Sequence, residues 1–258
     1  MKKAVFFDLD GTLWDEHSHI PDSAKKAIRL MHENGISLFV CTGRCGAYIT
    51  NQDLLALPFD GMIAGCGTHI TYNNEDIVYK SLPTTHVKKI VDVFAKYDIP
   101  LILEGRTHYY LEESDAPRLP FYHALRHDIG DNILSTKESE MNWEISKFAA
   151  FACNEHTSSA VAELSDICDI CIHNGIMIEG VPKGFNKAAA IKQVCEKLGI
   201  EDTYAFGDSP NDAEMLRSVG HGIAMGNGMP EAKAAAEYIT SSLQEDGIFN
   251  ACKHYSLI

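Results

Sequence analysis

The chain has 258 residues, of which 45% are hydrophobic and 22% charged, a composition that indicates a folded protein with a full core and excludes a disordered one. Its formal net charge of −14 repels nucleic acid and anionic membranes at long range, and no apolar run approaches the roughly 18 residues needed to span a bilayer. We therefore expect a cytoplasmic protein, a monomer or homodimer, with no nucleic-acid or membrane partner.

The first 82 residues alternate apolar strands with an amphipathic helix, as a parallel α/β sheet does. We predict strands at residues 4–9, 36–41 and 62–64, and a helix at 22–34 that ends at Gly35. The strand at 36–41 is apolar on both faces, which is typical of a central parallel strand. Two short strands, 70–72 and 77–79, flank Asn73-Asn74 and predict a hairpin turn.

The pattern changes at a crossing near residues 81–84 and changes back at a second crossing near 179–183. Between them we predict a helix at 85–96, strands near 100–104, 108–111 and 147–153, and a helix at 157–164. After them we predict helices at 185–198, 212–218 and 245–253 and strands at 203–206 and 222–225. The predicted fold is α/β: a Rossmann-like parallel-sheet core, residues 1–82 plus 183–258, split by an inserted α+β domain, residues 83–182.

The eight cysteines do not have the spacing of a disulfide framework, and several, such as Cys41 and Cys153, lie in apolar segments typical of strands. We interpret them as free thiols. Cys168 and Cys171, with His173 nearby, have a spacing found in zinc sites. No second pair accompanies them, and the surrounding isoleucines favour a buried strand.

Two carboxylates, Asp8 and Asp10, come directly after the first predicted strand, in the segment Asp-Leu-Asp-Gly-Thr. In open α/β sheets, ligands bind beyond the carboxyl ends of the strands, so this position favours a catalytic or metal site. A calcium loop would need further acidic and glycine positions that are missing. Taken alone, the two aspartates could equally be solvated turn residues.

Other polar groups lie at neighbouring strand ends. Thr42, Gly43 and Arg44 end the second strand, where the Thr42 hydroxyl and the N–H groups of the turn could hold phosphate oxygens. Asp208 follows the strand at 203–206 and would face Asp8.

Lys183 lies where the chain re-enters the core. Converging carboxylates are costly without a cation, and Mg²⁺, which prefers oxygen ligands, would supply positive charge together with Lys183. Such a set suits phosphoryl transfer.

Taken in order, these motifs resemble those of the haloacid dehalogenase (HAD) superfamily of phosphohydrolases, and within it the Cof-like branch with a large α/β cap. The matching segments are Asp8–Thr12, Thr42–Arg44, Lys183-Gly184 and Gly207–Asp212. Four ordered motifs make a specific signal, and the resemblance covers the whole chain. It implies a Mg²⁺-dependent phosphatase that hydrolyses small phosphorylated metabolites, such as sugar phosphates, through an aspartyl-phosphate intermediate, under a cap formed by the insertion.

The resemblance also implies roles for individual residues. Asp8 would attack phosphorus, and Asp10 would act as general acid and then as general base. The metal would be held by the Asp8 carboxylate, the Asp10 carbonyl and Asp208, with Asp212 completing its shell. The phosphoryl group would be bound by Thr42, Gly43, Lys183 and Asn211. Arg44 could contact phosphate or substrate, or merely pair with an acidic neighbour.

Two positions qualify this assignment. Asp10 stands where the ATPase members of the superfamily typically carry threonine, so a hydrolase or mutase is favoured. Cys66-Gly67 stands where the Cof-like branch usually has Asn-Gly, which puts any contact from an amide there in doubt; we interpret Cys66 as a small filler.

The substrate and the reaction class are less well defined. The insertion offers polar candidates for substrate contact, each of which is more often a solvated surface residue: Glu104, Arg106, His108, Arg118, His123, Arg126, His127 and His173-Asn174. A phosphomutase or phosphotransferase that uses the same intermediate is the alternative to hydrolysis. A non-catalytic phosphate-binding module on the same fold is a third hypothesis.

Overall fold

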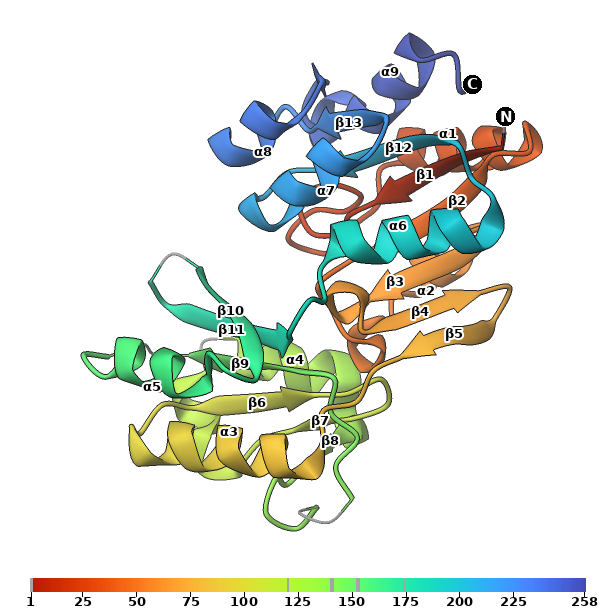
Figure 1. Ribbon diagram of the computed structural model, residues 1–258. Helices are drawn as coiled ribbons and strands as arrows, with labels where there is room; N and C mark the ends of the chain where they lie inside the picture. The colour runs from red at the N-terminus through yellow and green to blue at the C-terminus, as the bar shows by residue number, and fades with distance from the viewer. Residues whose placement is uncertain (1, 120, 140–141, 152–153, 174) are drawn as a thin grey trace. The chain divides into compact units, whose positions relative to one another are not determined.

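The computed structural model describes residues 2–119, 121–139, 142–151, 154–173 and 175–258 (Figure 1). Its contacts divide the chain into two compact units. We call residues 1–43, 51–77 and 186–258 the core unit, and residues 44–50 and 78–185 the insert unit. These boundaries lie a few residues from the predicted crossings, and the segment 44–50, which we expected in the core, groups with the insert unit.

The core unit is built on an eight-stranded sheet in the order β14-β13-β12-β1-β2-β3-β4-β5. Its central strands pair in parallel, and β3 pairs antiparallel with β4. Asn73 and Asn74 both have positive φ, the conformation of the predicted hairpin turn between β4 and β5. The strands are β1 (Lys3–Phe7), β2 (Ser37–Cys41), β3 (Gly61–Ala64), β4 (His69–Tyr72), β5 (Glu75–Tyr79), β12 (Asp202–Gly207), β13 (His221–Ala224) and β14 (Tyr238–Ile239).

The helices of the core unit bury one face and leave the other exposed. In α1, the predicted stripe is confirmed: Ala24, Ala27, Ile28 and Met31 are buried. Between the strands, aromatic rings fill the core, as where Phe7 stacks on Phe206 with ring centroids 5.0 Å apart. The helices are α1 (Asp22–Glu33), α2 (Gln52–Leu55), α6 (Lys187–Leu198), α7 (Ala213–Ser218), α8 (Pro230–Ala235) and α9 (Gly247–His254).

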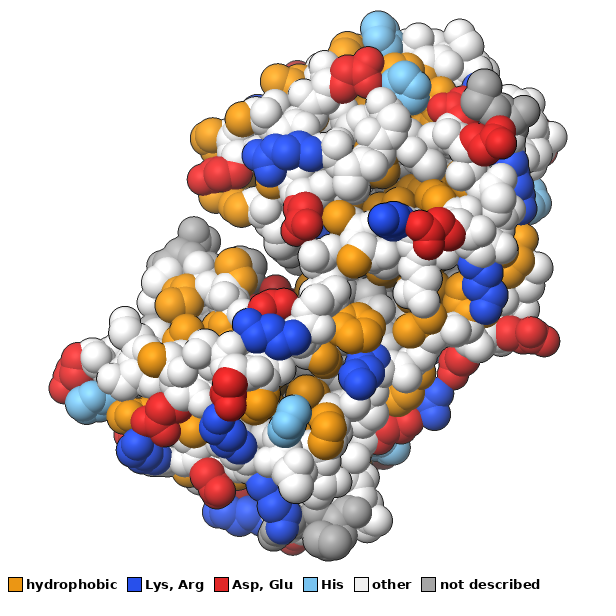
Figure 2. Space-filling view, in the orientation of Figure 1, with side chains coloured by type: hydrophobic (Ala, Val, Ile, Leu, Met, Phe, Trp, Pro, Cys, Tyr) orange, Lys and Arg blue, Asp and Glu red, His pale blue; other side chains and the backbone are white. Residues whose placement is uncertain are grey.

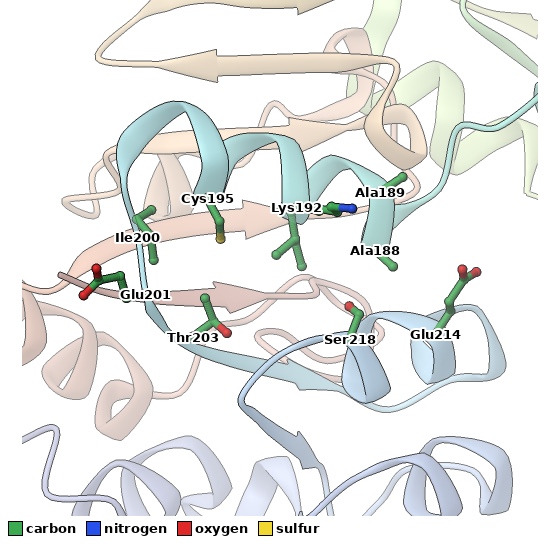
Figure 3. Close-up of a pocket in the computed structure, with 10 residues that line it drawn as sticks. Ala188, Ala189, Lys192, Cys195, Ile200, Glu201, Thr203, Glu214 and Ser218 are labelled. Carbon is green, nitrogen blue, oxygen red and sulfur yellow. The ribbon is translucent and has the colours of Figure 1, made fainter. Parts of the chain in front are cut away.

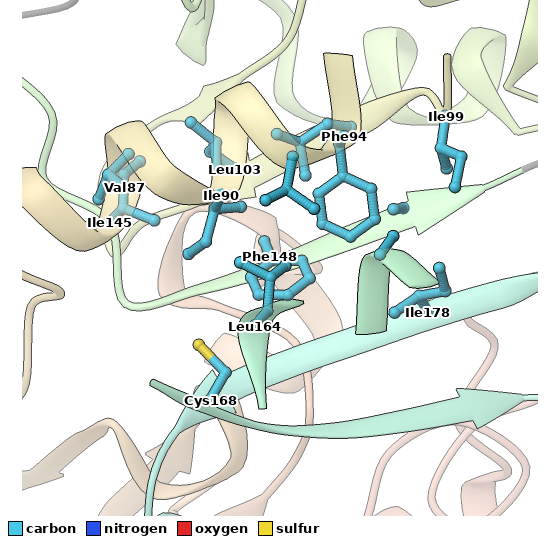
Figure 4. Close-up of a cluster of buried hydrophobic side chains, with 14 of the residues drawn as sticks. Val87, Ile90, Phe94, Ile99, Leu103, Ile145, Phe148, Leu164, Cys168 and Ile178 are labelled. Atoms are coloured by element: carbon cyan, nitrogen blue, oxygen red, sulfur yellow. The ribbon is translucent and has the colours of Figure 1, made fainter. Parts of the chain in front are cut away.

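The insert unit has a six-stranded sheet in the order β10-β11-β9-β6-β7-β8, antiparallel except for the pair β7-β8. Side chains alternate between its faces. Leu103 and Phe148 pack with helices α3 and α5 (Figure 4), whereas Ile102 and Ala149 pack with α4. The elements are α3 (Thr84–Lys96), β6 (Leu101–Glu104), β7 (Tyr109–Tyr110), α4 (Tyr122–Ile129), β8 (Ile133–Leu134), β9 (Lys147–Phe151), α5 (Thr157–Leu164), β10 (Cys168–His173) and β11 (Met177–Pro182).

The α/β class and the parallel core sheet are confirmed, while several smaller elements went unpredicted: α2, α4, β8, β11, α8 and β14. The strand predicted at Cys168–Cys171 exists as β10, but it is an edge strand and only partly buried. Cys168 is buried, Cys171 is exposed and Ile172 is 44% exposed. The end of the strand predicted to reach Cys153 lies outside the described residues. All the cysteines in the described ranges are free thiols.

On the face shown in Figure 2, acidic and basic side chains are interspersed. Among the described residues, no helix combines the length and apolarity needed to cross a membrane.

Candidate active site

Asp8 directly follows β1. It therefore lies at the edge of the sheet where the parallel strands β1 and β12 end. β1 lies between β12 and β2, and the Asp8 N–H donates to the Phe206 carbonyl at 3.0 Å, which extends the pairing with β12 by one residue. The Asp8 side chain is buried. This is the edge of an open α/β sheet at which ligands bind.

The loop after Asp8 is closed by its own backbone. The N–H groups of Thr12, Leu13 and Trp14 lie within 3.2 Å of the Leu9 carbonyl, and the Gly11 N–H donates to the Trp14 carbonyl. Gly11 has φ +80°, and a Cβ at this position would lie 2.4 Å from Oδ2 of Asp208. Glycine is therefore required here both by its backbone conformation and by the neighbouring carboxylate.

Asp208 and Asp212 come from the turn after β12. Oδ2 of Asp212 accepts the N–H groups of Asp208 and Ser209, each at 3.0 Å, in the capping box that starts the short 3₁₀ turn Pro210–Asp212. Oδ1 of Asp208 accepts the Thr12 hydroxyl at 2.9 Å. Asn211 is exposed and its Oδ1 accepts the Ser209 hydroxyl at 2.5 Å. The strand end and the capping box thus hold Asp208 beside the Asp8 loop.

The lysine beside the nucleophile candidate is Lys187, and our prediction of Lys183 for this position is wrong. Nζ of Lys187 lies 2.6 Å from Oδ1 of Asp8 and 2.7 Å from Oδ1 of Asp212, and all three side chains are buried. Lys183 belongs to the insert unit, is half exposed and pairs with Asp169 at 2.8 Å. The prediction failed because α6 begins at Lys187, four positions after Lys183. The first turn of α6 belongs to the core unit, so Lys187 and not Lys183 lies beside Asp8.

A signal for Lys187 was present in the sequence. Asn186 is the N-cap of α6, and its Oδ1 accepts the Ala189 N–H at 2.7 Å. A lysine in the first turn of a helix is electrostatically unfavourable, because the helix N-terminus carries partial positive charge. Once the first residue of α6 is known, an asparagine cap followed at once by lysine indicates a lysine that is held there for another reason.

A glycine also lets the loop after β3 approach α6. Gly67 has φ +94°, and a Cβ there would lie 2.7 Å from the Ala190 Cβ and 3.0 Å from the Asn186 carbonyl. Cys66, before it, is buried with φ 55°, and its N–H donates to the Thr42 carbonyl at 3.1 Å. The segment Cys66-Gly67 thus links the start of α6 to the end of β2.

Thr42 is buried at the end of β2, and its N–H donates to the Ile63 carbonyl at 2.8 Å. Gly43 is the last residue of this segment in the core unit. Arg44 groups with the insert unit, where its guanidinium lies 4.3 Å over the ring of Tyr48. Of the predicted phosphate-binding residues, Thr42, Gly43 and Asn211 belong to the same unit as Asp8, whereas Arg44 and Lys183 belong to the insert unit.

Asn227 reinforces the site without having been predicted as a site residue. Its Nδ2 donates to the Gly11 carbonyl at 2.7 Å, and its Oδ1 accepts the Leu243 N–H at 2.8 Å. It lies two residues after Met225, whose N–H donates to the Gly207 carbonyl at 3.0 Å. The segment after β13 thereby fixes the loop that carries Asp10 and Gly11.

Three carboxylates converge at this edge of the sheet. One oxygen each of Asp8, Asp208 and Asp212 lie within 4.8 Å of one another. Together with the Lys187 ammonium, three ionised carboxylates leave a net charge of −2 in a largely buried volume. Oxygen donors and excess negative charge suit a hard divalent cation such as Mg²⁺.

The titration behaviour reflects this crowding. Burial, with a further contribution from Asp212, raises the pKa of Asp8 well above its usual value, although the ammonium of Lys187 opposes the shift. Burial raises the pKa of Asp208 to about 6, partly offset by the Thr12 hydrogen bond. Burial would lower the pKa of Lys187, but Asp212 and Asp8 outweigh it and raise that pKa. The two carboxylates thus favour the ammonium form of Lys187, and a bound cation would favour the ionised carboxylates.

Six of the polar residues predicted as substrate contacts in the insert unit have protein partners. Glu104 is buried and accepts the Tyr109 hydroxyl at 2.8 Å. Arg106 pairs with Glu144, and Arg118 pairs with Asp98. Arg126 donates to the Gly130 carbonyl, His127 contacts Asp128, and His108 contacts Thr107. Asn174 lies outside the described residues.

A separate groove of about 450 Å³ lies on the core unit between α6 and α7 (Figure 3). Ala188 and Ala189 at the start of α6 line it, with Thr203 of β12 and Ser218 of α7. It contains none of the three converging carboxylates, so it is distinct from the candidate active site.

Comparison with known proteins agrees with this geometry. A family model described as haloacid dehalogenase-like hydrolase matches residues 5–252. The Bacillus subtilis (strain 168) 5-amino-6-(5-phospho-D-ribitylamino)uracil phosphatase YcsE is 29% identical over 99% of this chain and 96% of its own. The Shigella flexneri HMP-PP phosphatase is 28% identical over 93% of this chain and 89% of its own.

A solved structure of the HAD subclass IIB sugar phosphatase BT4131 superposes with a TM-score of 0.85, at 30% identity and with 100% of both chains covered. The predicted resemblance is thereby confirmed, and so is the predicted enzyme class. The family match spans nearly the whole chain and includes every residue of the carboxylate cluster. This chain belongs to the haloacid dehalogenase-like hydrolase family and is a hydrolase acting on phosphate esters.

Proposed function

We propose that this protein is a magnesium-dependent phosphatase that hydrolyses small phosphorylated metabolites, such as sugar phosphates, through an aspartyl-phosphate intermediate on Asp8. The observation that carries the proposal is the convergence of Asp8, Asp208 and Asp212 within 4.8 Å at the carboxyl edge of β1 and β12, with the Lys187 ammonium among them. Phosphoryl transfer depends on positioning and on positive charge around the transferred group, and this cluster can supply both.

The donor set supports Mg²⁺ as the cofactor. Asp8, Asp208 and the backbone carbonyl of Asp10 would hold the ion, with Asp212 beside them. Both carboxylate oxygens of Asp212 already accept hydrogen bonds, Oδ1 from Lys187 and Oδ2 from two backbone N–H groups. Asp212 therefore contributes mainly by orienting Lys187 and the Asp208 loop. When bound, Mg²⁺ neutralises phosphate oxygens and so favours attack by the anionic carboxylate of Asp8.

The two aspartates would divide the chemistry. A carboxylate oxygen of Asp8 attacks phosphorus and forms the new O–P bond, while the ester O–P bond breaks and the leaving oxygen takes a proton from Asp10. Asp10, now a carboxylate, takes a proton from water as the water oxygen attacks phosphorus. The Asp8–phosphorus bond then breaks, inorganic phosphate leaves, and Asp10 is protonated again.

Lys187 and Thr42 would bind the transferred phosphoryl group. The Lys187 ammonium is already at the nucleophile, 2.6 Å from Asp8, and can bond a phosphoryl oxygen attached there. Thr42 and Gly43 at the end of β2 add a hydroxyl and backbone N–H groups. Asn211, exposed beside the capping box, and Arg44 are further candidates for substrate contact.

The insert unit would act as a cap that selects the substrate. A lid that excludes water during the first transfer protects the aspartyl phosphate from early hydrolysis. The relatives support the substrate class, since YcsE is a 5-amino-6-(5-phospho-D-ribitylamino)uracil phosphatase and BT4131 is a sugar phosphatase. Free thiols throughout the described residues support a cytoplasmic location.

A screen of phosphorylated metabolites tests the proposal. With Mg²⁺ the wild type should release inorganic phosphate from at least one small phosphate ester, EDTA should abolish release, and Asp8→Asn should be inactive. Turnover retained in Asp8→Asn would contradict the covalent intermediate. Faster transfer from the phospho-enzyme to an added sugar than to water would favour the phosphomutase alternative. Tight binding without hydrolysis across the panel would favour a non-catalytic module.

A further inference from the structure

Trp14 makes a contact with Asp10 that the family motifs do not assign. Its indole Nε1 donates to Oδ1 of Asp10 at 2.9 Å. Trp14 is 1% exposed and is among the largest fully buried side chains, whereas Asp10 is exposed. A buried donor therefore holds an exposed carboxylate at the edge of the site.

The backbone fixes the donor as well. Trp14 donates its N–H to the Leu9 carbonyl at 3.1 Å and accepts the Gly11 N–H at 2.9 Å, so it closes the loop that contains Asp10 at both ends. Asp10 and Trp14 also form an isolated β-bridge. Asp10 and Trp14 are four positions apart in the sequence, and the loop between them is held in turn by Asn227 through Gly11.

We propose that Trp14 is a positioning residue for the proton transfers of Asp10. This inference rests on the proposed function, in which Asp10 protonates the leaving oxygen and later deprotonates water. An exposed aspartate can rotate among several side-chain conformations, and proton transfer needs hydrogen-bond geometry to the reacting oxygen. The indole N–H holds Oδ1 as an acceptor and so restricts the orientation of the whole Asp10 carboxyl group.

A purely structural role is the competing explanation, because a buried indole N–H needs an acceptor whatever its use. The two roles differ in which substrates they affect. If Trp14 positions the general acid, its loss impairs leaving groups that need a proton and spares those that do not. If it only packs the loop, all leaving groups suffer alike.

The first experiment therefore compares two leaving groups in single-turnover kinetics of alcohol release, which isolates the first transfer. An alkoxide needs protonation as it leaves, whereas 4-nitrophenolate does not. Trp14→Phe should slow release from an alkyl phosphate by about tenfold or more, since general acids contribute at least that much, and slow 4-nitrophenol release by less than about twofold. Equal losses for the two substrates would overturn the positioning role.

A matched control and an isostere remove the effect of altered packing. Trp143, the other tryptophan, donates its indole N–H to the Thr136 carbonyl at 3.0 Å in the insert unit, and Trp143→Phe should leave both rates unchanged. In that background, 3-benzothienylalanine at position 14 replaces N–H by sulfur in nearly the same shape. This variant should slow alcohol release from the alkyl phosphate while sparing 4-nitrophenol release, even where Trp14→Phe folds poorly. Wild-type rates with both substrates would overturn the inference.

The contact also has a readout without turnover. In ¹⁵N-tryptophan-labelled Trp143→Phe, the single indole resonance belongs to Trp14, and Asp10→Asn should move it; an unmoved resonance would overturn the inference. Should the wild type hydrolyse no ester, the proposed function fails and this inference falls with it. Hydrolysis without leaving-group selectivity in the variants overturns the inference alone.

Discussion

The ammonium of Lys187 lies 2.6 Å from Oδ1 of Asp8, so the candidate nucleophile and its nearest positive charge form a buried ion pair. The same ammonium bonds Asp212 at 2.7 Å, so it is held from two sides. A fixed cation next to the attacking oxygen suits a reaction in which negative phosphoryl oxygens approach that oxygen. We therefore expect Lys187, beside a bound metal, to contribute to charge stabilisation at this site.

Lys187→Met should reduce kcat by about a hundredfold or more, the scale seen when one preorganised donor is removed from an active site. Lys183→Met is the matched control, because Lys183 pairs with Asp169 in the insert unit and is half exposed. Its phosphatase activity should stay near that of the wild type. Steady-state kinetics of both variants, with folding checked by circular dichroism, make the comparison; a larger loss in Lys183→Met would reverse our assignment.

Gly11→Ala should disturb Asp208, because the added Cβ would lie 2.4 Å from its Oδ2 and φ is +80°. Gly35→Ala is a control with the same backbone conformation, φ +75°, but with no atom within 4 Å of the new Cβ. It should lose only about 1–2 kcal/mol of unfolding free energy from the left-handed conformation and keep its activity. Gly11→Ala should lose activity as well as stability. Equal activity in the two variants would contradict a role for Gly11 beside Asp208.

Much of this architecture followed from local patterns. The strands predicted just before Asp8 and Asp208 are present in the structure, because apolar runs between polar turns specify a buried parallel sheet. Parallel strands bring their carboxyl ends to one edge of the sheet. The amphipathic stripe of α1 specified its buried face in the same way. The convergence of the two aspartates is a consequence of strand order, which the motif order indicated.

The remainder depended on information that is not local. Choosing between Lys183 and Lys187 required the first residue of α6, and helix ends are the least certain feature of a sequence pattern. The contact between Trp14 and Asp10 depends on the folding of the loop between them, and Trp14 alone looks like any core aromatic. Glu104 looked like a surface residue, but it is buried because Lys147, 43 positions later, pairs with it across the sheet.

Metal binding can be tested apart from turnover. Mg²⁺ should raise the melting temperature of the wild type by several degrees, since a ligand at a hundred times its Kd stabilises the folded state by about 2.7 kcal/mol. Asp208→Asn should lose most of that shift, because it removes one of the three converging carboxylates. Asp202→Asn, at the opposite end of the same strand, should keep it. A full shift in Asp208→Asn, measured by differential scanning fluorimetry, would remove Asp208 from the metal site.

Lys147→Met should destabilise the insert unit in a pH-dependent way. Lys147 is buried between Glu179 and Glu104, and burial raises the pKa of Glu104 above its ordinary value while Lys147 holds that pKa down. Without Lys147 the pKa of folded Glu104 rises further. An acid whose pKa is higher in the folded than in the unfolded state costs stability as pH rises from the unfolded-state pKa to the folded-state pKa.

For Lys147→Met we expect the free energy of unfolding to fall by about 3–5 kcal/mol at pH 8, the usual result of unpairing a buried charge, and by less at pH 5. Urea unfolding at both pH values measures it, with Lys183→Met, which breaks an exposed pair, expected to lose at most about 1 kcal/mol. A loss in Lys147→Met that is equal at the two pH values would show that packing, rather than charge, accounts for its effect.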